Sequence, residues 1–470
     1  PAMFGRHAIG VLIIGFLCYS LLLHERYFCV VEALHLVHQW KASKGSILTA
    51  AVVQPSVLVE GEATHGHDNK HQQPILVAGG HADDGRIRCW RLSGGSSGGT
   101  KKETVQEIQV QGGSGGDGAK VHDGSIFSLT PLHTHQNVNY LVSGSFDRSA
   151  AIHRVDVATS SHVVTETIGR LSEHTGWVRL VEAVEVESLS SEVDDERTAG
   201  TSISLLSIGC NYINAWTFLA DGEVVRIARL DAGPSPDDPP DETFRRHDML
   251  SFAILDDDDD DNSKEKWIVA GLVDGTIRVF VAKFEEWMRR RQNSPYDATG
   301  SSGCPTTTAI AFDEQDSVVT IEDEKPFLSI NGHAGRITKV HCIHGFPNDF
   351  VTTSYDGTWK RWRIDAELKS LSKLVEGSMS KADERSNERI CSSIIISEND
   401  GQNNEIIYFG TSSGCLYRSW LSQGGESEKI YQANERDVSI TALTSWQRID
   451  RSVELDLIAC RSDGTAMVFR

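Results

Sequence analysis

Short segments in which apolar and polar residues alternate recur along the chain, and several of them follow an Asp-Gly pair. Residues 274–280, DGTIRVF, are one example. Alternation with a period of two is the pattern of a half-buried β-strand, and Asp-Gly is a preferred turn between antiparallel strands. The chain has 41 Gly against 12 Pro, which agrees with many tight turns. The pattern predicts an all-β fold built from short strands.

One unit of this kind repeats in a fixed register. Its strongest copy, residues 331–364, contains a Gly-His pair, two strand-like segments, an Asp-Gly turn and a third strand that ends near Trp362. Asp356 of the turn precedes Trp362 by six positions. The same spacing joins three further pairs, which are Asp84 with Trp90, Asp274 with Phe280, and Asp463 with Phe469.

Three weaker units fill the intervals between the strong ones and bring the total to seven. In each of them the turn residue or the aromatic residue is replaced or displaced by one position. They are residues 121–156 with Asp147 and His153, residues 173–218 with Asn211 and Trp216, and residues 389–421 with Ser413 and Trp420.

The unit resembles the WD repeat, which forms one blade of a β-propeller. The resemblance implies that His333, Thr352, Asp356 and Trp362 form a buried, hydrogen-bonded set with a structural role. The set is least complete in the last two units, which predicts that these units are softer. The remaining structural repeat positions are His122, Asp147, His174, Trp216, His247, Asp274, Asp84, Trp90 and Asp463.

The repeats predict a seven-bladed WD40-type β-propeller with long loop inserts over residues 27–470. The last repeat ends at Phe469 after its third strand, so we expect residues 27–40 to supply the missing outer strand and close the ring. The repeats lie near residues 34–92, 120–156, 172–218, 245–282, 331–364, 388–421 and 435–470.

Residues 1–26 form a separate apolar N-terminal segment. Residues 8–23 carry no charge and follow Arg6 and His7, which is the order of a signal sequence. The stretch is longer than a typical signal core and short for a membrane span of roughly 20 residues. A cleaved signal, a membrane anchor and a mis-set start stay open, and membrane contact is expected only through residues 8–23.

The chain is acidic, with a formal net charge of −21. This field repels a nucleic-acid backbone, so direct nucleic-acid binding is disfavoured. Nine cysteines occur singly, without a CxxC pair, and therefore indicate neither a zinc site nor a disulfide framework. Scattered free cysteines favour a reducing compartment, which predicts a cytoplasmic or nuclear location.

Catalytic chemistry has no recognisable signature in the sequence. Nucleophile elbows, phosphate-binding loops and the HExxH motif are all missing. We therefore expect no enzymatic activity, no cofactor and no metal. His65, His67 and His71 on one insert could converge on a transition metal, but a loop without fixed supporting partners rarely holds a specific ion.

Residues 283–292, KFEEWMRRRQ, predict a short helix on the long insert after the fourth repeat. An exposed Trp287 beside Arg289, Arg290 and Arg291 has the composition of an interface hot spot. We therefore expect Trp287 to be exposed, and these four are the candidate partner-binding residues. The alternative is a helix that covers the edge of the propeller.

The resemblance implies a non-catalytic scaffold that binds other proteins through its loops and top rim, as a subunit of a larger complex. Three alternatives stay open. A substrate receptor of a ubiquitin ligase commonly carries W-D-x-R, which is absent here. A subunit of an RNA-modification or ribonucleoprotein complex requires a basic face despite the acidic total. A membrane-tethered propeller of the secretory pathway depends on residues 8–23.

Overall fold

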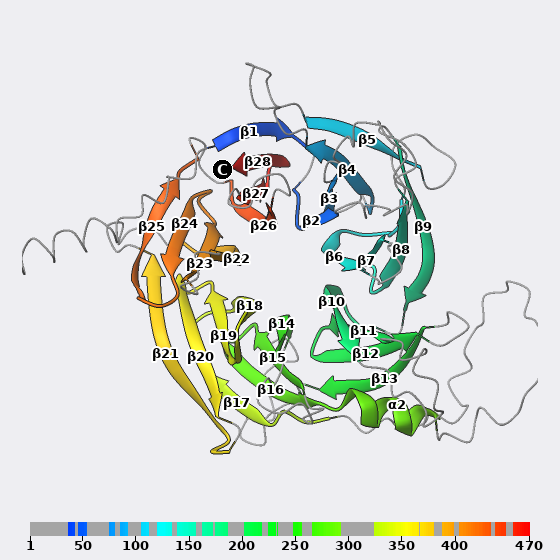
Figure 1. The fold of residues 1–470 in the computed structure, drawn as a ribbon, viewed down its shortest axis with the longest axis vertical. Coiled ribbons are helices and arrows are strands. Elements are labelled where there is room, and N and C mark those ends of the chain that lie inside the picture. The colour runs from blue at the N-terminus through cyan, green and yellow to red at the C-terminus, as the bar shows by residue number, and fades with distance from the viewer. Residues whose placement is uncertain are drawn as a thin grey trace, which may run out of the picture.

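The chain folds into a ring of β-sheets around a central axis (Figure 1). The computed structural model describes residues 36–42, 46–53, 75–79, 85–92, 105–111, 120–133, 139–156, 162–172, 174–186, 202–218, 224–231, 233, 248–255, 266–292, 324–365, 367–379, 388–398, 404–433, 438–447 and 455–470. Within these ranges the secondary structure is strands β1 to β28 and the helix α2. The all-β prediction is confirmed.

Three of the sheets contain four strands each, and each strand is antiparallel to its neighbours. In spatial order the first holds β10 (Val178–Val186), β11 (Ser202–Gly209), β12 (Tyr212–Phe218) and β13 (Val224–Asp231). The second holds β14 (Met249–Leu255), β15 (Lys266–Leu272), β16 (Thr276–Ala282) and β17 (Leu328–Asn331). The third holds β1 (Leu36–Lys41), β28 (Thr465–Phe469), β27 (Leu455–Arg461) and β26 (Ile440–Gln447).

Two further sheets contain eight strands each, and each divides into two antiparallel meanders of four. The outermost strands of the two meanders pair in parallel, β5 with β9 and β21 with β25. One sheet holds β2 (Ala50–Val53), β3 (Ile75–Gly79), β4 (Ile87–Leu92), β5 (Val105–Gln111), β6 (Ile126–His133), β7 (Asn139–Ser145), β8 (Ala150–Asp156) and β9 (His162–Leu171). The other holds β18 (Ile337–Ile343), β19 (Phe346–Ser354), β20 (Thr358–Asp365), β21 (Ser370–Met379), β22 (Ile390–Glu398), β23 (Asn404–Thr411), β24 (Leu416–Trp420) and β25 (Gly425–Tyr431).

The ring is closed by the two ends of the described chain. Strand β1 runs antiparallel to β28, with Leu36 opposite Phe469 and Lys41 opposite Thr465. Figure 1 shows β1 as the outer strand of the sheet that β26, β27 and β28 begin. The pairing covers a sheet edge that would otherwise expose unpaired backbone groups. The predicted closure by the N-terminal strand is therefore confirmed.

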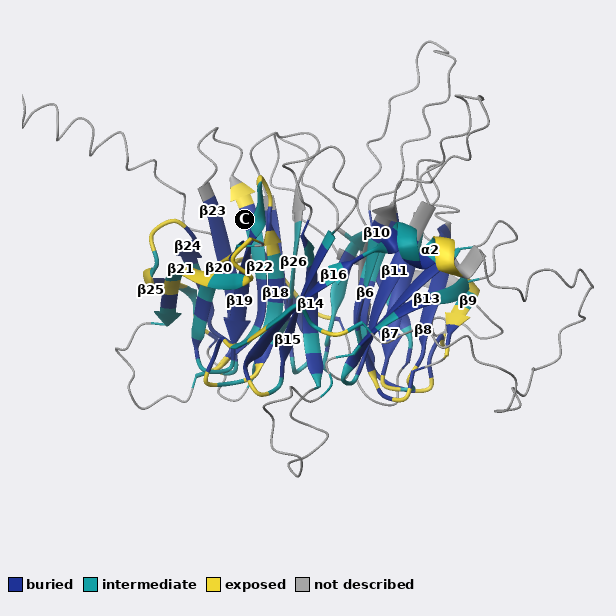
Figure 2. Ribbon diagram, turned by 90° about the horizontal axis from the view of Figure 1, so that it is seen from below, coloured by how far each residue is buried: buried dark blue, intermediate teal, exposed yellow. Residues whose placement is uncertain are grey.

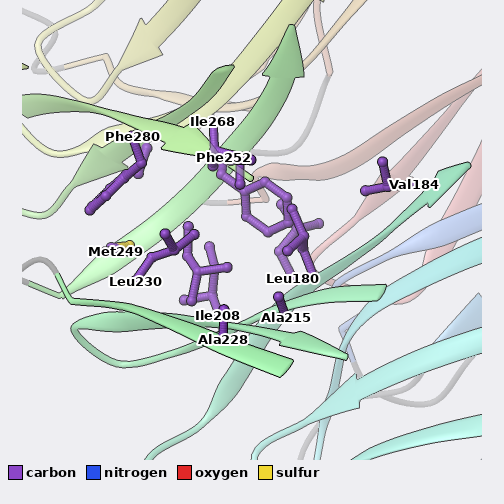
Figure 3. Close-up of a cluster of buried hydrophobic side chains, with 14 of the residues drawn as sticks. Leu180, Val184, Ile208, Ala215, Ala228, Leu230, Met249, Phe252, Ile268 and Phe280 are labelled. Carbon is purple, nitrogen blue, oxygen red and sulfur yellow. The ribbon is translucent and has the colours of Figure 1, made fainter. Parts of the chain in front are cut away.

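The hydrophobic core lies between neighbouring meanders, because each strand turns one face to the next sheet. In Figure 3, Leu180 and Leu230 of one sheet face Phe252 and Phe280 of the next. In the side view, buried residues occupy the middle of the strands, while exposed ones concentrate at the strand ends and turns (Figure 2). A single meander could not bury both faces, so the ring is stabilised as a whole.

The innermost strands share an irregularity near their first residues. Register shifts interrupt β6 after Ile126, β10 after Val178 and β18 after Ile337. The same shift occurs in β14, β22 and β26. A β-bulge leaves its extra residue outside the ladder and redirects its side chain. Phe127 and Arg179 occupy such positions in β6 and β10.

Candidate functional site

The strongest repeat contains the complete expected set of polar contacts. His333 Nδ1 lies 3.0 Å from Asp356 Oδ2, and His333 Nε2 lies 2.7 Å from Thr352 Oγ1. Trp362 Nε1 donates to the same hydroxyl over 2.8 Å. This series of hydrogen bonds is complete when Trp362 donates to Thr352, Thr352 to His333, and His333 to the carboxylate of Asp356. These side chains join the loop before β18 to β19, β20 and their turn.

A second copy of this arrangement lies around Asp147. His122 contacts Asp147 Oδ2 at 2.9 Å and Ser143 Oγ at 2.7 Å. His153 takes the place of the aromatic residue, with Nε2 lying 2.8 Å from Ser143 Oγ. Burial alone would raise the pKa of Asp147, but hydrogen bonds from His122 and Ser149 hold it well below its ordinary value.

A third copy lacks the carboxylate. His174 and Trp216 both contact Ser207 Oγ at 2.7 Å, with Trp216 Nε1 as a donor. The hydroxyl of Tyr212 accepts a hydrogen bond from the backbone N–H of Thr175 at 2.5 Å. Tyr212 therefore joins the loop before β10 to β12, as Asp356 joins the loop before β18 to its turn.

The remaining repeat positions are less elaborate. Asp274 Oδ1 accepts from the backbone N–H of Thr276 at 2.9 Å, and Asp463 Oδ1 accepts from that of Thr465 at 2.9 Å. The side chain of Trp90 is buried. Asp84 and His247 lie outside the described residues, as do residues 8–23 and the insert that carries His65.

Glu388 forms a polar set that the sequence did not predict. Its carboxylate accepts hydrogen bonds from Thr411 at 2.7 Å, from Tyr417 at 3.1 Å and from Ser413. These hydrogen bonds hold the pKa of Glu388 below its ordinary value, although burial alone would raise it. The acid precedes β22, whereas Asp147, Asp274, Asp356 and Asp463 lie in the turns of their units. The one sequence signal is Ser413, a neutral residue at the turn position, with an acid just before the first strand.

One end of the ring carries the turns between second and third strands and the residues that precede the innermost strands. We call this end the turn face. The two parts are joined by backbone hydrogen bonds, such as Phe146 N–H to Ser125 O and Tyr355 N–H to Arg336 O, both 2.9 Å. The same bond joins Val273 to Asp248, Ser412 to Arg389 and Ser462 to Ser439. Phe146 and Tyr355 therefore occupy equivalent places in different sheets.

An aromatic cluster lies on the turn face where the sheet of β6 meets that of β10. The rings of Phe146 and Trp177 stack with centroids 4.5 Å apart, and Phe127 lies 6.3 Å from both. Phe146 is 45% exposed and Trp177 is 39% exposed. The guanidinium of Arg179 lies 5.2 Å from the Trp177 ring centroid. Two large stacked rings thus remain open to a ligand.

A second group on the turn face combines arginines with one tyrosine. The guanidinium carbon of Arg336 lies 3.4 Å from the ring centroid of Tyr355, and that of Arg389 lies 5.7 Å from it.

Arg148 lies in the turn after β7 and has a φ of 68°. The corresponding turns after β15, β19, β23 and β27 have glycine at positive φ. This left-handed conformation is unfavourable for arginine.

Helix α2 (Phe284–Gln292) places its candidate residues differently from the prediction. Trp287 is only 2% exposed, packs against Phe284 and belongs to the core between the β10 and β14 sheets. Its expected exposure was wrong, because the helix lies along the outer strand β13 (Figure 1) and turns its apolar side inward. Arg289 and Arg290 are exposed and pair with Glu285 and Glu286 at i,i+4. The side chain of Arg291 lies outside the described set.

Neither a metal site nor a membrane helix occurs among the residues that the structure describes. They contain no group of three or more His, Cys, Asp or Glu side chains that could hold a metal ion. In the same part of the chain, no helix has the length and apolar character needed to cross a membrane.

The ring, its closure and its polar sets define the fold as that of a WD40 β-propeller. One solved structure that shares it is described as the crystal structure of the WD40 beta propeller domain of Doa1, with a TM-score of 0.50 and 12% sequence identity. The match covers 93% of this chain and 97% of that one. At this identity the likeness shows the fold alone. The sequence matches no family model and no curated protein.

Proposed function

We propose that the chain is a non-catalytic, seven-bladed WD-repeat scaffold that binds other proteins through its turn face. The blade count is supported by the strand pairing, since three four-stranded sheets and two pairs of four-stranded meanders make seven units. The described buried apolar residues also form seven clusters, each between two neighbouring meanders. Seven interfaces between units are what a closed ring of seven requires.

The binding role rests mainly on the exposed stack of Phe146 and Trp177 beside Arg179. In the free protein, exposed aromatic rings leave apolar surface in contact with water, which is unfavourable. Trp and Arg also dominate the energetics of protein interfaces. The turn face also joins loops from several sheets, so a bound partner would contact a surface that the whole ring keeps rigid. The His, Asp and Trp repeat positions hold these loops in place and are proposed as structural.

Affinity purification of the tagged full-length chain tests this proposal. We expect the double variant Phe146→Ala/Trp177→Ala to lose partners that the wild-type chain retains, while its melting temperature stays close to that of the wild type. Arg290→Gln is the matched control, because it removes an exposed arginine on α2, away from the turn face. An unchanged partner set for the aromatic variant, or an equal loss in the control, would contradict the proposal.

A second candidate is a subunit of a ribonucleoprotein or RNA-modifying complex. The observation that favours it is the group of arginines beside aromatic rings on the turn face, since bases stack on aromatic side chains. The net charge of −21 opposes it. Nuclease treatment before elution separates the candidates, because partners held by RNA are then released and partners held by the protein remain. A cytoplasmic or nuclear location stays a prediction.

A further inference from the structure

Four arginines on the turn face stand without a carboxylate partner. The guanidinium groups of Arg148, Arg179, Arg336 and Arg389 form no hydrogen bond or ion pair with any residue that the structure describes. Arg148, Arg336 and Arg389 are exposed, and Arg179 is half-buried. The contacts that Arg179, Arg336 and Arg389 make through their charged groups are with aromatic rings.

Arginines elsewhere in the ring differ in this respect. Arg361 pairs with Asp349 at 2.6 Å, Arg418 with Glu428 at 2.7 Å, and Arg470 with Asp456 at 2.8 Å. The chain has 66 acidic residues against 45 basic ones, so carboxylates are in excess. A group of arginines that form no ion pair with a described carboxylate is therefore an unusual local charge in an acidic protein, and it favours an external anion.

The positive charges on the turn face act on one another. Loss of water around the guanidinium of Arg336, which lies on the Tyr355 ring, lowers its pKa, and the charges of Arg179 and Arg389 lower it further. Burial also lowers the pKa of Arg179, and the carboxylate of Asp248 acts to raise that pKa. An anion bound between Arg179, Arg336 and Arg389 would relieve their mutual repulsion.

The aromatic rings also prepare these arginines for a ligand. A guanidinium that lies flat on a ring keeps its N–H donors in its own plane, directed away from the ring. Carboxylates bind such a planar edge through two parallel hydrogen bonds. The guanidinium carbon of Arg336 lies 3.4 Å from the Tyr355 ring centroid, which is a stacking distance, and that of Arg179 lies 5.2 Å from the Trp177 centroid and 5.7 Å from the Phe127 centroid. The stacked Phe146 and Trp177 offer an adjacent apolar surface.

We propose that the turn face binds an acidic, extended segment of a partner protein that also carries an apolar side chain. Its carboxylates contact Arg179, Arg336 and Arg389, with Arg148 at the margin, and its apolar side chain packs on Phe146 and Trp177. The proposal rests on the scaffold function above and names the chemistry of the partner. A peptide fits better than a nucleic acid, because a long polyanion meets the repulsion of the whole acidic chain.

Fluorescence anisotropy with the purified full-length chain tests the proposal. The probe is a labelled peptide of alternating Asp and Glu with one central Phe. The matched peptides replace the acids by Asn and Gln, or the Phe by Ser. We expect the acidic peptide with Phe to bind at least about tenfold more tightly than either matched peptide, and its affinity to fall as salt is added.

Arginine variants link this binding to the turn face. We expect Arg336→Gln/Arg389→Gln to weaken binding of the acidic peptide at least about tenfold. Arg290→Gln, which neutralises an exposed arginine of α2, should leave it unchanged. Thermal melts show whether each variant is folded, and Arg336→Lys serves as a milder second variant, because it keeps the charge but loses the planar edge.

The outcomes separate the acidic-segment proposal from the scaffold function. Equal affinity for the acidic and neutral peptides, or equal effects of the Arg336 and Arg290 variants, would overturn the acidic chemistry. The scaffold function would still stand if Phe146→Ala/Trp177→Ala lost its partners. Tighter binding of a labelled single-stranded RNA, weakened by the same arginine variants, would overturn the peptide in favour of nucleic acid. If the acidic peptide did not bind and the aromatic variant lost no partner, both the acidic-segment proposal and the scaffold function would be contradicted.

Discussion

The turn face and helix α2 both combine tryptophan with arginine, yet they place these residues in opposite ways. On the turn face, Trp177 is 39% exposed and stacks on Phe146, beside an arginine without a carboxylate partner. In α2, Trp287 is 2% exposed, and Arg290 pairs with Glu286. The same composition thus produces an exposed surface with unpaired arginines in one region. In the other it produces a helix that covers the edge of a sheet, with its tryptophan buried and its arginine paired to an acid. Composition alone does not distinguish a binding surface from a structural one.

Truncating the two tryptophans should give the largest difference between the regions. Trp287→Ala removes a buried side chain from the core cluster that joins the β10 and β14 sheets, so we expect unfolding free energy to fall by about 3–5 kcal/mol. Trp177→Ala removes a partly exposed ring and should cost less than about 1 kcal/mol. Urea unfolding of both variants measures the difference. Equal losses would mean that Trp177 is a core residue rather than a binding residue.

Acidic pH should weaken the fold beneath the turn face without removing the charges on it. Burial lowers the pKa of His153 to about 3, of His174 to about 4 and of His341 to about 3. The unfolded chain takes up these protons near its ordinary histidine pKa of about 6.5, and the folded chain does not. Stability is therefore present above that pH and is lost as the pH falls below it.

The size of this effect follows from the difference between folded and unfolded pKa. We expect each of the three histidines to cost about 1 kcal/mol of unfolding free energy at about pH 5.5. Arginines stay charged there, so binding by the molecules still folded should not change. His341→Gln should reduce the pH sensitivity by about one third, since Gln can still donate to Ser393. A pH profile identical to that of the wild type would contradict the assignment.

Two neighbouring residues in one turn should separate structure from binding. Asp356→Ala breaks the contacts with His333 and Thr358, so we expect a loss of about 1–3 kcal/mol of stability while folded molecules still bind partners. Tyr355→Ala should cost less stability but weaken binding, because Arg336 loses the ring that orients it. Thermal melts and pull-downs on both variants test the pair. Binding lost at unchanged stability in Asp356→Ala would make Asp356 functional.

Much of the ring could be predicted from the sequence because its signals are local. The Asp-to-aromatic spacing predicted the repeats, and the complete set around His333 predicted its hydrogen bonds. The early end of the last repeat predicted the pairing of β1 with β28. The edge-covering alternative for α2 also had a local signal, since Glu285 and Glu286 stand four positions before Arg289 and Arg290.

The turn-face cluster had no such signal. Phe127, Phe146 and Trp177 come from two different sheets, and their contacts depend on how those sheets pack. Phe127 and Arg179 lie at β-bulges, where the strand period of two no longer indicates which way a side chain points. Glu388 was missed for a related reason, because its partners Thr411 and Tyr417 come from later strands.

Glu388 also changes the expectation that the last two units are softer. The β22 sheet lacks the histidine and turn aspartate, but Glu388 supplies three hydrogen bonds at the same end of the sheet. In the β26 sheet, Asp463 accepts a hydrogen bond from the backbone N–H of Thr465 and lies 3.4 Å from the guanidinium of Arg461. The softness expected for both units therefore stays a prediction for β26 to β28, and is less supported for β22 to β25.

We propose that this propeller binds its partner through the turn face. Hydrogen exchange of the full-length chain, measured with and without a co-purified partner, tests it most directly because it covers every region at once. We expect slower exchange in residues 122–128, 145–149, 174–180, 334–338 and 388–392, with α2 unchanged. Protection confined to residues 284–292, or to the opposite end of the ring, would contradict it.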